Sequence, residues 1–279
     1  MRSMAASMRS PRVRAARALA KRALRERSKL FLAEGPQALR EALRHKNEHG
    51  GGLTELFVTT PARSRHADLV DAASAAGVPV HEVSGEVMAD LAQTVTPQGL
   101  LAVCPFIDVP LDNLIAAHPR LVVVLANVRD PGNAGTVLRT ADAAGAGGVI
   151  FAAASVDPYN SKCVRSSAGS LFHLPLVTGI PVSEAISTLR GAGLAVLAAD
   201  GSAKLGLDQL DADGRLGDPT AWLFGNEAWG LPGDLVALAD EAVAIPIYGQ
   251  AESLNLAAAA AVCLYASARA QVGGAAQSG

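Results

Sequence analysis

Three segments of this 279-residue chain combine glycine with polar side chains in patterns that could form a ligand site. They span residues 127–139, 224–232 and 245–255, and each follows a short apolar run that is typical of a buried strand. Ligands of parallel α/β sheets bind outside the carboxyl ends of the strands. We therefore expect the three segments to meet at adjacent strand ends and to form one pocket.

The first segment turns through Pro131 and Gly132 into a predicted helix that carries Arg139. Asn133 can cap this helix. Arg139 lies one turn inside it and can project toward the strand end, where its five donors would suit a phosphate. The alternative is a capped helix whose arginine pairs with a nearby aspartate.

The second and third segments also allow a structural explanation when taken alone. Gly225 lets a ligand approach the backbone closely, and Glu227 could order a loop or begin a helix. Ser253 is a suitable N-cap for the last helix. No G-x-S-x-G elbow surrounds Ser253, which argues against a serine hydrolase, and the common glycine-rich nucleotide motifs are absent from the sequence.

The C-terminal half alternates strand and helix patterns, which predicts an α/β domain with a mostly parallel sheet. The run 121–125 is continuously apolar, as expected for a strand that is buried on both faces. The predicted strands are 121–125, 148–151, 194–199, 222–224 and 242–246, and the predicted helices are 135–144, 183–192, 231–237 and 254–270.

The N-terminal half predicts a smaller α/β unit, and three prolines in 105–119 indicate a linker after it. The predicted helices are 13–32, 37–46, 67–76 and 86–93, and the predicted strands are 56–59, 78–83 and 100–104.

Charge is distributed unevenly along the chain. Of its 24 basic and 26 acidic residues, ten basic and one acidic lie in residues 1–29, which leaves 14 and 25 for the rest. Such a basic segment on an acidic body suggests a polyanionic partner, although a solvated helix face or a disordered tail would have the same composition.

Composition also limits the class of protein. The longest apolar run, 256–266, is shorter than the ~18 residues of a membrane span, and no secretory signal is indicated, so we expect a soluble cytoplasmic protein without a membrane partner. The three cysteines are widely spaced and form no C-x-x-C pair, which predicts buried thiols rather than a zinc site or disulfides.

The ordered set of motifs changes the interpretation. Three motifs occur in this order along the chain: Asn-x-Gly-x-x-x-Arg, then Phe-Gly-Asn-Glu-x-x-Gly-Leu, then Ile-Pro-Ile with Ser-Leu-Asn and a helix. Together they resemble the SpoU (TrmH-like) family of RNA ribose 2′-O-methyltransferases over roughly residues 120–270. Residues 31–43 and 96–100 carry a weaker resemblance to the family's substrate-binding domain.

The resemblance implies a fold and partners. It predicts a basic N-terminal helix plus an RNA-binding α/β domain in 1–105, a linker in 106–119, a trefoil-knotted methyltransferase domain in 120–272 and a flexible tail in 273–279. The family acts as homodimers on RNA and uses S-adenosylmethionine (AdoMet) as methyl donor. We expect no metal, because the leaving group of this reaction is neutral and the sequence contains no cluster of metal ligands. We expect ribosomal RNA of the 23S type as substrate, with transfer RNA as the alternative.

The resemblance also implies roles for individual residues. The cofactor-binding set is Gly225, Ile245 and Leu254, and the catalytic set is Asn133, Arg139, Glu227, Ser253 and Asn255. Trp229 departs from the family pattern, in which smaller or polar residues are common, and it could narrow the pocket or pack on a partner.

Two other functions compete with this one. A catalytically silent RNA-binding or ribosome-assembly factor could share the fold, but the intact polar set argues against it. A nicotinamide-dependent reductase could use a doubly wound sheet, but the glycine fingerprint of such enzymes is missing.

Overall fold

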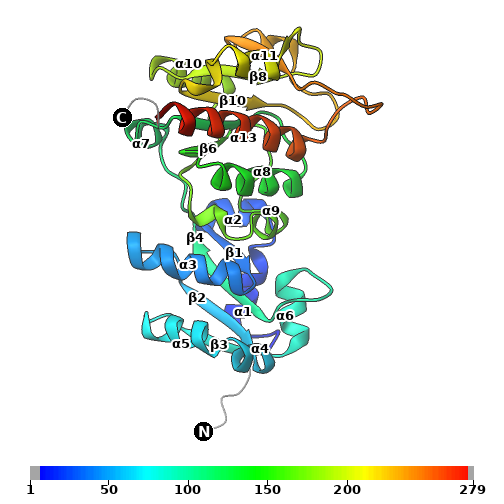
Figure 1. Ribbon diagram of the computed structural model, residues 1–279. Coiled ribbons are helices and arrows are strands. Elements are labelled where there is room, and N and C mark those ends of the chain that lie inside the picture. The colour runs from blue at the N-terminus through cyan, green and yellow to red at the C-terminus, as the bar shows by residue number, and fades with distance from the viewer. Residues whose placement is uncertain (1–6, 276–279) are drawn as a thin grey trace. The chain divides into compact units, whose positions relative to one another are not determined.

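The computed structural model describes residues 7–275, which divide into two compact units (Figure 1). Unit 1 comprises the chain up to Ile107 together with Asp157–His173, and unit 2 comprises Asp108–Val156 and the chain from Leu174 onward. The prediction of two α/β units is therefore confirmed, but the boundary between them differs from the one we expected.

Unit 2 contains a seven-stranded sheet in the order β7-β6-β5-β10-β8-β11-β9, and all of its neighbouring strands are parallel. Its strands are β5 (Leu121–Leu125), β6 (Gly148–Phe151), β7 (Leu176–Thr178), β8 (Ala195–Ala199), β9 (Leu205–Gly206), β10 (Thr220–Phe224) and β11 (Glu241–Ala244). Its helices are α7 (Leu111–Ala116), α8 (Pro131–Ala143), α10 (Val182–Gly191), α11 (Leu207–Ala212), α12 (Gly233–Val236) and α13 (Leu256–Ala275), with a 3₁₀ turn at Arg215–Gly217.

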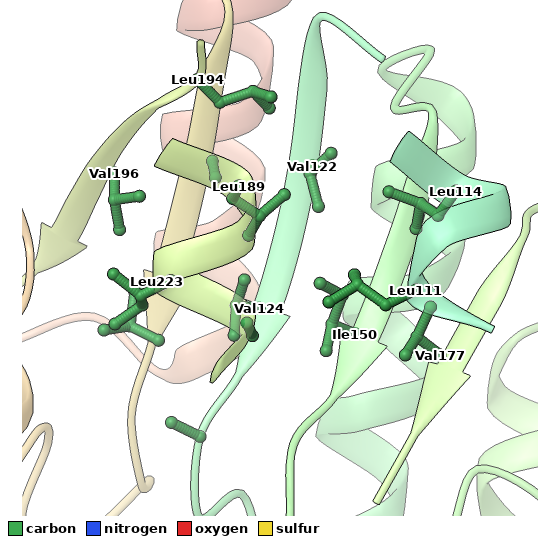
Figure 2. Close-up of a cluster of buried hydrophobic side chains, with 14 of the residues drawn as sticks. Leu111, Leu114, Val122, Val124, Ile150, Val177, Leu189, Leu194, Val196 and Leu223 are labelled. Carbon is green, nitrogen blue, oxygen red and sulfur yellow. The ribbon is translucent and has the colours of Figure 1, made fainter. Parts of the chain in front are cut away.

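One face of this sheet packs against α7 and α10 (Figure 2). Alternate residues of the central strands, among them Val122 and Val124 of β5 and Leu223 of β10, contribute to the buried cluster. Leu114 of α7 and Leu189 of α10 cover them. The intervening residues of β5 are also buried, which confirms that this strand is covered on both faces.

The opposite face packs against α8 and α13, which also contact each other. Trp222 points to this face, and its indole Nε1 donates a hydrogen bond of 2.9 Å to the buried hydroxyl of Ser267 in α13. Among the described residues, α13 alone has the length and hydropathy of a membrane span, over Leu256–Gly273, although core helices of soluble proteins share these properties. In this fold, one side of helix α13 packs against the sheet at β10 and β5.

Unit 1 contains a mixed four-stranded sheet in the order β1-β4-β2-β3, in which only β2 and β3 are parallel. Its strands are β1 (Leu30–Glu34), β2 (Glu55–Thr59), β3 (Val80–Val83) and β4 (Leu100–Pro105). Its helices are α1 (Pro11–Ala18), α2 (Arg22–Ser28), α3 (Pro36–His49), α4 (Thr60–Arg65), α5 (Ala67–Ala75), α6 (Gly85–Ala92) and α9 (Ser161–Ser166), with a 3₁₀ turn at Ser170–Phe172.

The basic N-terminal segment is folded from Pro11 onward. The single predicted helix 13–32 is wrong, because α1 and α2 are separate and β1 follows them in the sheet. Val13 and Leu19 are buried in a cluster with Met88 of α6, while the basic side chains between them face solvent. The first six residues of the predicted basic arm lie outside the described residues.

Segment 157–173 joins unit 1, although it lies between two strands of unit 2 in the chain. The ring of Tyr159 stacks on Phe106 with centroids 3.9 Å apart, and it also contacts Phe31 at 4.7 Å. This insertion could not be predicted from local patterns, because the aromatic residues that hold it are distant in the sequence.

The predicted linker 106–119 and tail 273–279 also need correction. Residues 108–119 belong to unit 2, where α7 buries Leu111 and Leu114 in the core, so the prolines mark the start of a helix rather than a free connection. Helix α13 continues to Ala275, beyond the predicted fraying at Gly273, and the remainder of the predicted tail, 276–279, lies outside the described residues.

All three cysteines lie within the described residues, where they are buried and form no disulfide, as predicted. Burial raises the pKa of the Cys104 and Cys263 thiols, because the charged thiolate is poorly solvated inside the protein. These thiols are therefore protonated core residues.

An ion pair between Arg25 and Asp157 fixes the inserted segment to α2. The guanidinium donates to Asp157 Oδ2 at 2.9 and 2.6 Å and to the carbonyl oxygens of Leu19 and Ala20 at 2.8 and 2.9 Å. The side chains of Arg25 and Asp157 are only 4% and 9% exposed.

We predict that Arg25→Ala lowers the free energy of unfolding by about 3–5 kcal/mol, because the substitution leaves a buried carboxylate without its cation. Chemical denaturation measures the loss. Arg22→Ala is the matched control, since its ion pair with Glu26 is exposed and should contribute under ~1 kcal/mol. Equal effects of the two substitutions would contradict the assigned role of Arg25.

Candidate active site

The first polar loop leaves the sheet at the end of β5. Asn127 adopts a left-handed conformation, with φ of 58°, and α8 begins at Pro131. Asp130 is the N-cap, and its Oδ1 accepts a hydrogen bond of 2.9 Å from the backbone N–H of Asn133. The expectation that Asn133 caps the helix is therefore wrong, and its side chain remains available for other contacts.

The second loop leaves the sheet beside the first. Strand β10 is paired in parallel with β5, and Phe224 at its end is in register with Leu125. The following turn closes through reciprocal backbone hydrogen bonds between Asn226 and Gly230. A Cβ atom at Gly225 would lie 2.4 Å from the carbonyl carbon of Gly230, so this tight closure requires glycine.

Glu227 joins the two loops. Its Oε2 accepts a hydrogen bond from the backbone N–H of Arg129 at 3.1 Å, and its Oε1 accepts one from Asp130 at 2.9 Å. The Nδ2 of Asn133 donates to the same Oε1 at 3.5 Å. Glu227 therefore orders a loop, which is one of the two roles that we expected for it. The loop that it orders is the one after β5 and not its own.

The third loop follows β11 and leads into α13. Asn255 Oδ1 accepts a hydrogen bond of 2.8 Å from the N–H of Ala258. Asn255 is thus the N-cap of α13, and the prediction that Ser253 fills this position is wrong. Ser253 is exposed two residues before the cap.

The second and third loops, together with the residues that follow β8, surround one cavity of about 320 Å³ in unit 2. No residue of the first loop lines it, so the expectation that all three segments form one pocket is wrong. The lining includes the predicted residues Gly225, Glu227, Ile245, Ser253 and Leu254. Its other members are Ala199, Asp200, Gly201, Phe224, Asn226, Ala228, Gly230, Val243, Ile247, Glu252, Leu256 and Ala259. The cavity is large enough for a small-molecule ligand, which typically needs about 300–1,000 Å³.

The other three predicted residues lie outside the lining. Asn133 contacts Glu227, and Asn255 lies between the lining residues Leu254 and Leu256. Arg139 is exposed on α8 and makes no hydrogen bond or ion pair with any described residue. The alternative in which Arg139 pairs with a nearby aspartate is therefore not supported within residues 7–275.

Sequence reasoning missed the part of the lining that β8 supplies. Ala199, Asp200 and Gly201 follow this strand, which is the neighbour of β10 in the sheet. The signal was present, because Asp-Gly after a predicted strand marks a strand end of the same kind as the other three. Trp229 is 62% exposed and does not line the cavity, so it does not narrow the pocket.

Among residues 7–275, no three His, Cys, Asp or Glu side chains come together in a way that could hold a metal ion. The predicted absence of a metal from the reaction stays a prediction. The charged groups in the described lining are the carboxylates of Asp200, Glu227 and Glu252.

Comparison with known proteins identifies the family. The profile of the SpoU rRNA Methylase family matches residues 120–265, which contain all three loops. The chain belongs to this family. The profile of the MRM3-like substrate binding domain matches residues 10–102. The resemblance seen in the motifs is thus confirmed for both halves of the chain, whereas the trefoil knot stays a prediction.

Relatives cover nearly the whole chain. The 23S rRNA (guanosine(2553)-2′-O)-methyltransferase RlmP of Bacillus subtilis is 32% identical over 86% of this chain and 89% of its own length. The AdoMet-bound rRNA methyltransferase of Sinorhizobium meliloti superposes with a TM-score of 0.80, at 31% identity over 94% of this chain and 96% of that one.

A second solved structure is the SpoU methyltransferase AviRb of Streptomyces viridochromogenes in complex with the cofactor AdoMet. It has a TM-score of 0.80 and 29% identity, and the match covers 95% of this chain and 99% of AviRb.

We predict that Gly225→Ala weakens binding of S-adenosylhomocysteine, the demethylated form of AdoMet, by about tenfold or more, because the new methyl group must displace the turn that lines the cavity. Titration calorimetry measures the affinity. Gly233→Ala is the control, since a Cβ there would meet no atom within 4 Å. Wild-type affinity in Gly225→Ala would contradict the assigned position of the pocket.

Proposed function

We propose that this chain transfers a methyl group from AdoMet to a ribose 2′-hydroxyl of RNA, and that its substrate is ribosomal RNA of the 23S type. The observation that carries the proposal is one cavity formed by the loops that follow β8, β10 and β11, with Glu227 linking the loop after β10 to the loop after β5. The names of the relatives support the reaction and the substrate, and transfer RNA is the alternative substrate.

The residues present fit AdoMet. Phe224, Val243 and Ile245 form an apolar part of the lining that suits an adenine ring, while Gly225 and Gly230 present backbone without side chains. Leu254 covers the cavity from the third loop. These residues would hold a molecule that combines an apolar base with hydrogen-bonding groups.

AdoMet would supply a methyl group that is already electrophilic, because it is bonded to a sulfonium. The protein must then position the ribose oxygen and assist the loss of its proton. Arg139 is unsuited to act as a general base, since a guanidinium group remains cationic and has no lone pair available to accept a proton. We assign it to stabilise the developing alkoxide and to bind an adjacent phosphate.

Asn133, Ser253 and Asn255 complete the assigned catalytic set. Glu227 orients Asn133 by accepting its Nδ2–H, and Asn255 fixes the start of α13 next to Leu254. Glu227 and Asn255 thus act by positioning the loops, while Arg139 and Asn133 are assigned to the RNA ribose.

Unit 1 would hold the RNA. Its match to a substrate-binding domain supports this role, and so do the basic side chains of α1 and α2. Only RNA carries the 2′-hydroxyl, which explains selection against DNA. We also place the protein in the cytoplasm, where cysteines without disulfides are expected.

We propose a homodimer as the active form. Helix α13 leaves Val262 and Tyr265 exposed at 40% and 53% of their surface, three residues apart on one side of the helix. A second copy could cover these apolar side chains.

Arg139→Ala should reduce methyl transfer to rRNA by at least ~1,000-fold while AdoMet affinity stays within about threefold of wild type, because the guanidinium acts on the transition state. Arg139→Lys should recover little, since lysine lacks the planar fork. Transfer of tritiated methyl to rRNA and calorimetry measure the two properties. Wild-type turnover in Arg139→Ala would contradict the role assigned to this residue and favour a different catalytic residue. If the wild-type protein binds RNA but transfers no methyl group, the alternative of a catalytically silent RNA-binding factor would be favoured.

Substituting Arg12, Arg14, Lys21 and Arg27 by Gln should weaken RNA binding more at low salt than at high salt, because each lost phosphate contact reduces the salt slope by about 0.7–0.9. These residues are exposed, whereas deletion of the whole segment would remove buried residues such as Val13. Filter binding over a salt series measures the slope. Lys204→Gln with Arg269→Gln on unit 2 is the control, and an unchanged slope in the fourfold variant would exclude this surface.

Sedimentation equilibrium should give twice the chain mass for the wild type and a monomer for Val262→Asp with Tyr265→Asp, because charges would be buried at the interface. Val95→Asp, at an equally apolar but 97% exposed position in unit 1, should stay dimeric. A monomeric wild type would rule out the homodimer.

A further inference from the structure

Asp200 occupies a strand end next to the loops already described. It follows β8, which lies between β10 and β11, and it lines the same cavity as Gly225. Its backbone N–H donates to the carbonyl oxygen of Val243 at 3.0 Å. The backbone of Asp200 is therefore fixed by the sheet rather than carried on a free loop.

The carboxylate of Asp200 is held by one oxygen only. Oδ1 accepts hydrogen bonds from the N–H and the hydroxyl of Ser202, at 2.9 and 2.8 Å. Oδ2 accepts no hydrogen bond from any residue in the described range 7–275. Because an ionised carboxylate can accept about four hydrogen bonds, Asp200 presents an oriented acceptor to a ligand in the cavity.

The other two carboxylates of the lining are less suited to this role. Both oxygens of Glu227 are engaged by backbone N–H groups of the first loop. Glu252 is exposed on the third loop, and no hydrogen bond from a described residue holds its side chain. Asp200 is thus the one oriented carboxylate with a free oxygen in the described lining.

The surroundings of Asp200 indicate which group it meets. Ala199, which precedes it, is paired with Val243, and both residues line the cavity together with Phe224 and Ile245. This apolar surface suits the adenine ring of the methyl donor. A ribose joined to a base in that position presents two adjacent hydroxyl donors to a carboxylate at the edge of the apolar surface.

We propose that Asp200 binds the ribose diol of the methyl donor through Oδ2 and so selects a ribonucleoside in the cofactor pocket. The inference rests on the proposed function, because it takes AdoMet as the ligand of this cavity. It assigns a residue to the donor's own ribose, which is distinct from the RNA ribose that receives the methyl group.

Titration calorimetry on the full-length protein tests this contact with two ligands that share the nucleoside. S-adenosylhomocysteine carries the amino-acid part with its ammonium group, and 5′-methylthioadenosine lacks it. Asp200→Asn keeps an oxygen for Ser202 but removes the charge, so both ligands should bind about tenfold or more weakly, and by a similar factor. The control is Asp213→Asn, which removes the same charge from an exposed residue that does not line the cavity. It should leave the affinities for both ligands unchanged.

Each other result would overturn the assignment in a different way. A loss for S-adenosylhomocysteine alone would place the ammonium group, and not the diol, at Asp200. Unchanged affinities in Asp200→Asn would show that the carboxylate does not contact the ligand. A wild-type protein that binds neither compound would contradict the proposed function itself, and with it this inference.

Discussion

The contact on which the site depends is the one between the carboxylate of Glu227 and the backbone N–H groups of Arg129 and Asp130. It joins the loop after β10 to the loop after β5, and it fixes the position from which α8 begins. Helix α8 carries Asn133 and Arg139, so the placement of these residues relative to the loop after β10 depends on the charged hydrogen bonds that Glu227 accepts. The side chain of Asn226 adds a hydrogen bond of 2.9 Å to the carbonyl oxygen of Asn127. Parallel pairing of β5 with β10 brings the two loops within reach.

The features that sequence could predict are those set by local chemistry. The apolar runs 121–125 and 148–151 were located to the residue, because a strand buried on both faces must be apolar throughout. Five of the eight predicted site residues line the cavity, since glycine and polar residues after such runs mark the strand ends of a parallel sheet.

The features that sequence could not predict depend on distant contacts or on chemically equivalent neighbours. Asn, Asp and Ser cap helices about equally well, so local sequence does not distinguish Asp130 from Asn133 or Asn255 from Ser253. Segment 157–173 joins unit 1 through Arg25 and Tyr159, whose partners are far away in the chain. Asp200 carried a local signal that went unused, because its motif has no part in the family resemblance.

The position of the transferred methyl group tests the central claim most directly. Ribosomal RNA methylated with labelled AdoMet by the wild-type protein can be hydrolysed completely with alkali, which cleaves the chain only where a 2′-hydroxyl is free. The account predicts that the label remains in an alkali-stable dinucleotide, since a methylated ribose oxygen blocks cleavage at that nucleotide. Label released in mononucleotides would place the methyl group on a base and contradict the account.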